Sequence, residues 1–256
     1  MADADARLLS GVAVVTGAGS GLGRALARTL AARGVKVAAL GRRIDPLEET
    51  ARGQANILPL ACDVADAAAL EDCFAVLRQE LGPVSLLVNN AAVYPRRDVF
   101  QESHARFMET VATNLGGTFG ATRLALDDMA EAGFGRIVNV ASFADIAPLP
   151  ASAAYSVSKG AARILTRALV ADLADRLPEI VISDWLPGML ATDMGIPDGL
   201  APEVAAEWGA TLALWHDRSL NGTSFEMNRE LPPPRGLKTR IKDRLLLRRA
   251  PAPRLL

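Results

Sequence analysis

The fold is decided by residues 12–23, which read Val12-Ala13-Val14-Val15-Thr16-Gly17-Ala18-Gly19-Ser20-Gly21-Leu22-Gly23. The stretch opens with apolar, mostly β-branched residues, as in a strand that is buried inside a parallel sheet. Residues 24–33 follow the glycine-rich turn with apolar side chains at helical spacing, and residues 35–40 are apolar again except for Lys36. This order predicts a strand, a tight turn, a helix and a second strand, which together make a βαβ unit.

The glycines between the first strand and the helix indicate a phosphate-binding turn. Glycine lets the backbone approach a pyrophosphate closely, and the N-terminus of the following helix attracts its charge. The spacing is T-G-x-x-x-G-x-G with an extra glycine, and a merely flexible turn is the alternative interpretation. Its position between a strand and a helix favours a dinucleotide site. The residues expected to contact this ligand are Gly17, Gly19, Ser20, Gly21, Leu22 and Gly23.

The end of the second strand bears on the choice of dinucleotide. An acidic residue at this place binds the ribose 2′-hydroxyl of NAD, whereas an arginine accommodates the 2′-phosphate of NADP. The sequence has Gly41-Arg42-Arg43 and no acid at the tip of the strand. NADP(H) is therefore favoured over NAD(H), with Arg42 and Arg43 as contacts. Asp45 nearby keeps NAD(H) open, and both arginines could instead be solvated at a helix start.

Strands and helices alternate through the rest of the chain up to residue 231. Further strands are expected over 56–62, 84–88, 135–140, from 180 onward and over 223–227, with helices over 46–53, 66–81, 103–132, 153–177 and 202–215. Alternation of this kind predicts an α/β fold with right-handed crossovers. We expect a Rossmann-type, doubly wound parallel sheet of about seven strands with helices on both faces, three layers in all. Residues 1–231 would form a single domain.

Composition excludes several other classes of protein. The 256 residues are half hydrophobic with a net charge of −1, which gives no general argument for binding nucleic acid. Two cysteines, Cys62 and Cys73, suit a reducing compartment rather than a disulfide framework. Residues 1–10 lack the apolar run of a signal peptide, and no apolar stretch is long enough to span a membrane. A cytoplasmic location is expected. No cluster of His, Cys and carboxylate residues indicates a metal.

A tyrosine and a lysine four residues apart, Tyr155 and Lys159, share one face of an expected helix. A phenol titrates at about pH 10 and is a poor acid or base near neutrality. A nearby ammonium lowers the pKa of the phenol, which can then act as a general acid or base. The pair alone is equally typical of a solvated helix surface. Further polar residues at the ends of the expected strands supply the context.

Taken together, these motifs resemble the short-chain dehydrogenase/reductase family in its compact, single-domain branch. The match covers residues 10 to about 228 in the family's order, with Ser142 placed thirteen residues before Tyr155. The quoted elements are Thr16-Gly17-x-x-x-Gly21-x-Gly23, Asp63, Asn89-Asn90-Ala91, Asn114, Ser142, Tyr155-x-x-x-Lys159 and Pro187-Gly188-x-x-x-Thr192.

The resemblance implies an oxidoreductase that interconverts a carbonyl compound and an alcohol, as a ketoreductase does. Tyr155 would exchange the proton of the substrate oxygen, Ser142 would hold that oxygen, and Lys159 would lower the pKa of Tyr155 and bind the nicotinamide ribose. Asn114 would support a proton relay that reaches Lys159 through water. The remaining cofactor contacts that the resemblance implies are Asp63, Val64, Asn89, Ala91, Pro187, Gly188, Leu190 and Thr192.

Two other functions are alternatives to this one. A dinucleotide-binding regulator without activity would be expected to have lost some of Asn114, Ser142, Tyr155 and Lys159, and none is lost. An epimerase or dehydratase of the extended branch usually has another glycine spacing and a longer C-terminal part. Substrate identity is left open, although Tyr94, Phe143, Ile146, Leu149, Met189 and Trp185 are candidates for an apolar pocket, Trp185 equally for the core.

The chain departs from the family pattern at three places. Ala92 stands where the family usually has glycine, the loop after Thr192 is short, and the C-terminal end is Phe225-Glu226-Met227-Asn228-Arg229. A homodimer or homotetramer is expected, with the tetramer in doubt. Residues 232–256 form a basic tail with eight basic residues and one acidic residue. It could be a solvated segment, a lid, an arm on a partner subunit, a dock for an acidic partner or, more weakly, a membrane contact.

Overall fold

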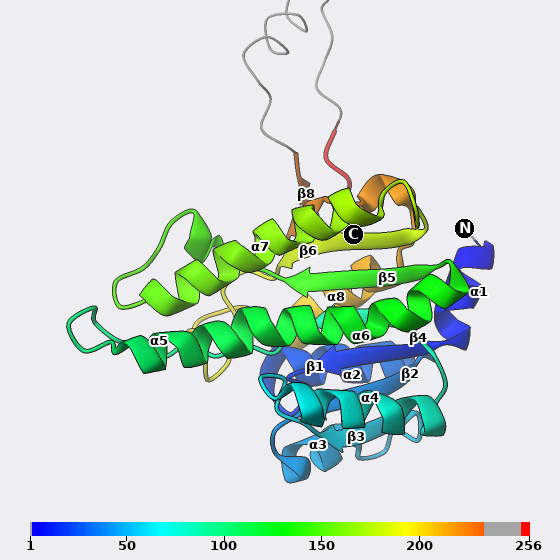
Figure 1. Ribbon diagram of the computed structural model, residues 1–256, viewed down its shortest axis with the longest axis horizontal. Coiled ribbons are helices and arrows are strands. Elements are labelled where there is room, and N and C mark those ends of the chain that lie inside the picture. The colour runs from blue at the N-terminus through cyan, green and yellow to red at the C-terminus, as the bar shows by residue number, and fades with distance from the viewer. Residues whose placement is uncertain (1, 233–251) are drawn as a thin grey trace, which may run out of the picture.

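The computed structural model of the protein describes residues 2–232 and 252–256 (Figure 1). One sheet forms its centre, with strands in the order β3-β2-β1-β4-β5-β6-β7-β8. The bounds are β1 Val12–Thr16, β2 Lys36–Gly41, β3 Ile57–Ala61, β4 Val84–Asn89, β5 Gly135–Val140, β6 Ile180–Leu186, β7 Ser224–Glu226 and β8 Arg229–Leu231. The seven strands β1–β7 are parallel, as predicted, and the short β8 is added antiparallel to β7.

Helices cover both faces of the sheet, so the doubly wound, three-layer prediction is confirmed (Figure 1). On one face lie α4 Ala67–Glu80, α6 Gly117–Ala132 and α7 Ala153–Leu173, and on the other α2 Gly21–Ala32, α3 Ile44–Ala51 and α8 Pro202–Leu214. Asp66 caps α4, because its carboxylate accepts hydrogen bonds from the amides of Ala68 and Ala69 at 3.0 and 3.2 Å.

Each face of the sheet has its own hydrophobic core, because successive side chains of a strand point to opposite faces. This alternation is visible in β1, where Ala13 and Val15 join the core beneath α2 and α8, while Val12 and Val14 join the core beneath α4 and α6. Trp185 belongs to the first core and is fully buried, so it packs inside the fold rather than beside a pocket.

The expected helix over residues 103–132 is divided into three parts. α5 runs over His104–Val111, a π-helical turn follows over Ala112–Gly116, and α6 continues from Gly117. A π turn inserts one residue into the helical ladder and is often found at functional sites. The wider turn carries Asn114, whose side chain leaves the helix to bind another segment.

Three further elements lie outside the sequence predictions. α1 covers Ala2–Ser10, β8 lengthens the sheet, and the end of the chain returns to β8 through a bridge between Arg229 and Leu255. The remainder of the predicted basic tail, residues 233–251, lies outside the described residues. Among the helices that the structure describes, none has both the length and the apolar character needed to cross a bilayer.

Candidate active site

A cavity of about 1060 Å³ opens at the carboxyl ends of the parallel strands. Segments that follow β1 to β6 line it, because the carboxyl ends of parallel strands meet at one edge of the sheet. The predicted site residues that it brings together are Gly17, Gly19, Ser20, Gly21, Leu22, Gly23, Arg42, Arg43, Asp63, Val64, Ala91, Ser142, Tyr155, Lys159, Pro187, Gly188, Leu190 and Thr192. Residues far apart in sequence thus face a single space.

The glycine-rich turn fits a bound pyrophosphate. A methyl group on Gly23 would lie 2.2 Å from the carbonyl oxygen of Gly17, and Gly17 itself has a φ of +67°, so this tight turn excludes larger residues. α2 begins directly after the turn, and the side chain of its N-cap Ser20 makes no capping hydrogen bond. The first amides of a helix have no partners within the helix and carry a partial positive charge. They are therefore available to an anion.

Two arginines line the same cavity at the end of β2. Arg42 and Arg43 are exposed side chains that follow Gly41, and Asp63 and Val64 line the cavity after the neighbouring strand β3. Asp45, the acid that could have favoured the ribose hydroxyls of NAD, does not line this cavity. It lies instead at a separate hollow that α3 and β3 line together. The cationic side chains at the tip of β2 are thus the ones that face the cavity.

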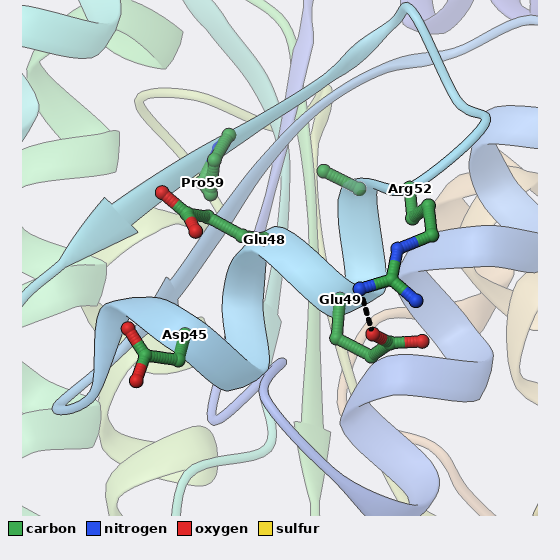
Figure 2. A pocket seen from close by; sticks show the side chains of 6 residues that line it. Asp45, Glu48, Glu49, Arg52 and Pro59 are labelled. Carbon is green, nitrogen blue, oxygen red and sulfur yellow. Dashed lines mark ion pairs between the residues drawn. The ribbon is translucent and has the colours of Figure 1, made fainter.

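Figure 2 shows this second hollow, which has a volume of about 560 Å³. Asp45, Glu48, Glu49 and Arg52 of the α3 region line it together with Pro59 of β3, and an ion pair of 2.6 Å joins Arg52 to Glu49. None of the predicted site residues lies here. Its charges are solvated, with 75% of the Arg52 side chain exposed, and a surface ion pair of this kind contributes little. We assign no chemistry to it.

The helix α7 and the end of β5 hold the polar groups of the candidate active site. Ser142 follows β5, and Tyr155 and Lys159 lie in the first two turns of α7. The Lys159 ammonium is buried and donates a hydrogen bond of 2.7 Å to the carbonyl oxygen of Val140, which ends β5. The hydroxyl of Ser142 accepts a hydrogen bond of 3.1 Å from the amide of Ala144. Both side chains are therefore fixed by the backbone around β5.

Burial dominates the titration of these groups. The pKa of Tyr155 is raised from its ordinary value by burial, while a hydrogen bond with Ser142 lowers it and nearby Tyr94 raises it. Burial also lowers the pKa of Lys159 to about 8, against an opposing effect of the negative charge of Asp184. The pKa of the phenol is thus raised overall, because desolvation outweighs the other effects, and the lowering contribution of Lys159 stays a prediction.

Two of the predicted asparagines support the cavity from outside its lining. Asn114 exchanges hydrogen bonds with the backbone of Val93, accepting from its amide at 2.7 Å and donating to its carbonyl at 3.0 Å, and it donates to Ser158 at 3.0 Å. It thereby ties the segment after β4 to α7. Asn89, expected in the cofactor channel, lies below the lining of the cavity and donates hydrogen bonds to Thr122 and Asn139. Its neighbour Asn90 lines the cavity instead.

The structure adds two side chains that the sequence did not single out as parts of a chemical centre. The ring of Tyr94 stacks on that of Tyr155 with 4.3 Å between their centroids, so it covers the predicted acid–base residue. Asp184 of β6 lies buried beneath α7. Phe143, Leu149 and Met189 line the cavity as expected, but Ile146 does not. Neither Tyr94 nor Asp184 belongs to a recognisable motif. For Tyr94 the one signal in the sequence was its position after β4, and for Asp184 there was none.

Comparison with known proteins identifies a single family. A sequence profile described as short chain dehydrogenase matches residues 11–200. The chain is similar to a 2-(R)-hydroxypropyl-CoM dehydrogenase of Xanthobacter autotrophicus, with 36% identity over 194 residues that cover 73% of this chain and 77% of the relative.

Two further relatives have other substrates in their names. Galactitol 2-dehydrogenase (L-tagatose-forming) of Cereibacter sphaeroides is 35% identical over 206 residues, covering 79% of this chain and 80% of the relative. An NADP-dependent (R)-specific alcohol dehydrogenase of Lentilactobacillus kefiri is 31% identical over 192 residues, covering 73% and 76%. The chain belongs to the short-chain dehydrogenase/reductase family of NAD(P)-dependent oxidoreductases.

Proposed function

We propose that the protein is an NADP(H)-preferring reductase or dehydrogenase that interconverts a carbonyl compound and its alcohol, with Tyr155 as general acid and base. The observation that carries this proposal is a single cavity that joins the glycine-rich turn and Arg42 to Ser142, Tyr155 and Lys159. The printed name of one relative, an NADP-dependent alcohol dehydrogenase, supports the choice of cofactor. So does the position of Asp45 outside the cavity.

The residues that would hold the cofactor follow from the lining of the cavity. The turn from Gly17 to Gly23 and the start of α2 would bind the pyrophosphate, and Arg42 and Arg43 would bind the 2′-phosphate. Leu190 and Thr192 would hold the nicotinamide end, as the resemblance implies. When bound, the nicotinamide supplies or accepts the hydride, and the protein positions the substrate for that transfer.

The polar groups near β5 would manage the proton. Tyr155 would donate its phenolic proton to the carbonyl oxygen during reduction and take the hydroxyl proton during oxidation. Ser142 would hydrogen-bond the same oxygen and orient it, and Lys159 would supply a buried positive charge that favours the phenolate. Asn114 would keep the segment after β4 in place against α7. Apolar side chains, among them Phe143, Leu149 and Met189, would contact the rest of the substrate.

The test is coenzyme oxidation by the 256-residue chain on a panel of ketones and aldehydes, with alcohols and oxidised coenzyme for the reverse direction. We expect turnover with NADPH to exceed turnover with NADH, and Tyr155→Phe to reduce kcat by at least about a hundredfold while coenzyme binding, followed by fluorescence titration, is retained. Coenzyme binding without turnover on the whole panel would favour the inactive regulator. Unchanged turnover in Tyr155→Phe would exclude Tyr155 as the acid–base group.

A further inference from the structure

Asp184 is a buried carboxylate for which the proposed reaction has no role. It lies in β6, next to β5 in the sheet (Figure 1), where it is paired with Asn139 of β5 and, on the other side, with Ser224 of β7. Only 3% of its surface is exposed, and it is the one acidic residue in the buried set of the described chain. A buried carboxylate is costly unless it is hydrogen-bonded or paired with a positive charge.

Hydrogen bonds fix the position of this carboxylate beneath α7. The hydroxyl of Thr166 donates to Asp184 at 2.6 Å, and the same hydroxyl accepts from Asn139 at 2.8 Å. Asn139 in turn accepts from Asn89 at 2.8 Å. The chain of bonds therefore runs from β6 through α7 to β5 and β4. Within the part of the chain that the structure describes, its bonded donor is the neutral hydroxyl of Thr166, so this bond leaves the negative charge of Asp184 to act on the cations around it.

The charged groups around Asp184 come from two elements. Lys159, Arg163 and Arg167 share one face of α7 with Thr166, because residues four and seven or eight positions apart are stacked on a helix. Asp145, from the 3₁₀ turn Phe143–Asp145, pairs with Arg163 at 2.7 Å. Within the described residues, Lys159 has no carboxylate at ion-pair distance. The ammonium of Lys159 instead donates its hydrogen bond to the carbonyl of Val140. Val140 follows Asn139, and Asn139 is paired with Asp184 on the neighbouring strand β6.

We propose that Asp184 is a positioning residue for the reaction: its carboxylate keeps the buried Lys159 ammonium charged beside Tyr155 and so sets the pH range in which Tyr155 exchanges its proton. This inference rests on the proposed function. It does not require Asp184 to touch the substrate or the cofactor. The residue acts through Lys159, and Tyr155 lies one helical turn before Lys159 on α7.

The direction of the effect follows from the charges. Burial disfavours both charged forms, so the pKa of Lys159 falls to about 8 and the pKa of Asp184 rises to about 6. Between these values the ammonium and the carboxylate are both charged, and the negative charge of Asp184 favours the charged form of Lys159. Removing the negative charge lowers the pKa of Lys159 further. The ammonium then helps the Tyr155 phenolate less, and a higher pH is needed to deprotonate the phenol.

The decisive variant is Asp184→Asn, which keeps the shape and an oxygen acceptor for Thr166. Two quantities are measured between pH 5 and pH 10: kcat/KM for alcohol oxidation, and the titration of Lys159 by NMR of protein labelled at lysine Cε. We expect the acid limb of the rate profile to move to higher pH, with kcat/KM about tenfold lower on that limb and recovery at higher pH. The Lys159 midpoint should move to lower pH.

Thr122→Val is the matched control, because Thr122 bonds to Asn89 in the same buried network but carries no charge. It should leave both midpoints in place. A purely structural role of Asp184 would instead lower kcat at every pH in Asp184→Asn without moving either midpoint, and that result would overturn the proposal.

Two further outcomes separate this inference from the proposed function. If the wild-type chain shows no turnover, the proposed function fails, but the NMR titration of Lys159 still tests Asp184. If Asp184→Asn does not fold, the carboxyl of Asp184 is titrated by NMR in the wild-type chain. A carboxyl that stays protonated through pH 8 carries no charge to act on Lys159, and the inference is then wrong.

Discussion

Single side chains at the candidate site titrate away from their ordinary values, and burial is the main cause at each. The pKa of Tyr155 is raised, that of Lys159 is lowered to about 8 and that of Asp184 is raised to about 6. All three changes favour the neutral form. Tyr155 and Lys159 line one cavity, and perturbed groups are typical of functional sites because catalytic acids and bases need pKa values matched to their task. Burying charged groups also costs free energy unless they are paired. The site is therefore expected to reduce stability.

Asp184→Asn tests this expectation through its effect on unfolding. A carboxyl with a raised pKa in the folded state contributes stability below its ordinary pKa of 3.8, and this stability is lost as the pH rises through about 6. The asparagine variant loses nothing over that range. Its free energy of unfolding should therefore match that of the wild type near pH 4 and exceed it by about 3 kcal/mol at pH 8.

Urea unfolding at a series of pH values gives the measurement. The difference between Asp184→Asn and wild type must grow with pH, and most of the growth must fall between pH 4 and about pH 6. A variant that is less stable at every pH would show that the carboxylate is a net stabilising partner of Arg163 and Arg167 instead. If Asp184→Asn gains stability in urea unfolding and loses activity in the rate profile, two independent measurements describe the role of Asp184.

The sequence predicts site residues well where the chemistry requires a fixed spacing. Tyr155 and Lys159 must be one helical turn apart, and the glycines must lie where a side chain would collide with the backbone, so both patterns are visible without a structure. Asp184 has no such pattern. It is one polar residue near the end of an apolar strand, and its importance depends on which helix face packs over it. Only the tertiary structure brings Thr166 and Lys159 to that place.

At the scale of elements, the π turn at residues 112–116 connects the candidate site to its scaffold. It presents Asn114 to the backbone of Val93 and to Ser158, so three hydrogen bonds join the segment after β4 to α7. The last residue of the turn and the first of α6 are adjacent glycines that differ in their surroundings. Gly116 is exposed, whereas Gly117 is buried against Val64, which follows β3.

This contrast gives a matched pair of variants. A methyl group on Gly117 would lie 2.5 Å from a methyl carbon of Val64, which lines the cavity, while a methyl group on Gly116 would meet no atom within 4 Å. We expect Gly117→Ala to destabilise the protein by about 1–3 kcal/mol through overpacking and to weaken coenzyme binding by displacing Val64. Gly116→Ala should be neutral or stabilise by up to about 1 kcal/mol, because alanine favours helical backbone.

Thermal unfolding and coenzyme titration of the two variants provide the comparison. Equal effects of both substitutions would contradict the assigned packing, since the helical backbone is the same at the two positions.

Helix and strand positions were largely predictable from apolar periodicity, with differences of a few residues at their ends. The π turn was not, because it depends on a side chain of Asn114 finding the backbone of a distant segment, which sequence spacing does not specify.

At the scale of the whole molecule, the sheet is completed by the end of the chain. β7 and β8 are short strands at one edge, and the last residues return to them: Leu256 donates from its amide to the carbonyl of Asn228 at 2.9 Å. Seven parallel strands followed from the alternation of strands and helices. The antiparallel edge strand β8 and the returning C-terminus could not be predicted in this way. The short strands near Pro232 contain too few residues to show the alternation of apolar and polar side chains. An unpaired strand edge invites association with other chains.

Arg254 is the main anchor of this returning segment. Its guanidinium makes two hydrogen bonds to the carboxylate of Glu230, at 2.8 and 2.7 Å, bonds Ser219 at 2.7 Å and lies 5.6 Å from the ring centre of Trp215. Arg254→Ala should therefore reduce the free energy of unfolding by about 1–2 kcal/mol at pH 7, as for a bidentate pair that is partly buried. Urea unfolding and hydrogen exchange of the Leu256 amide measure the loss.

The effect of Arg254→Ala should also depend on pH in one direction. Hydrogen bonding to Arg254 lowers the pKa of Glu230, so this pair contributes stability above the ordinary glutamate value of 4.5 and loses it as the pH falls through the lower, folded value. The variant and the wild type should converge in strongly acidic solution. Arg52→Ala is the control, because its pair with Glu49 is exposed (Figure 2) and should change stability by no more than about 0.5 kcal/mol. Equal losses in the two variants would mean that Arg254 behaves as an ordinary surface cation and does not hold the C-terminus on the sheet.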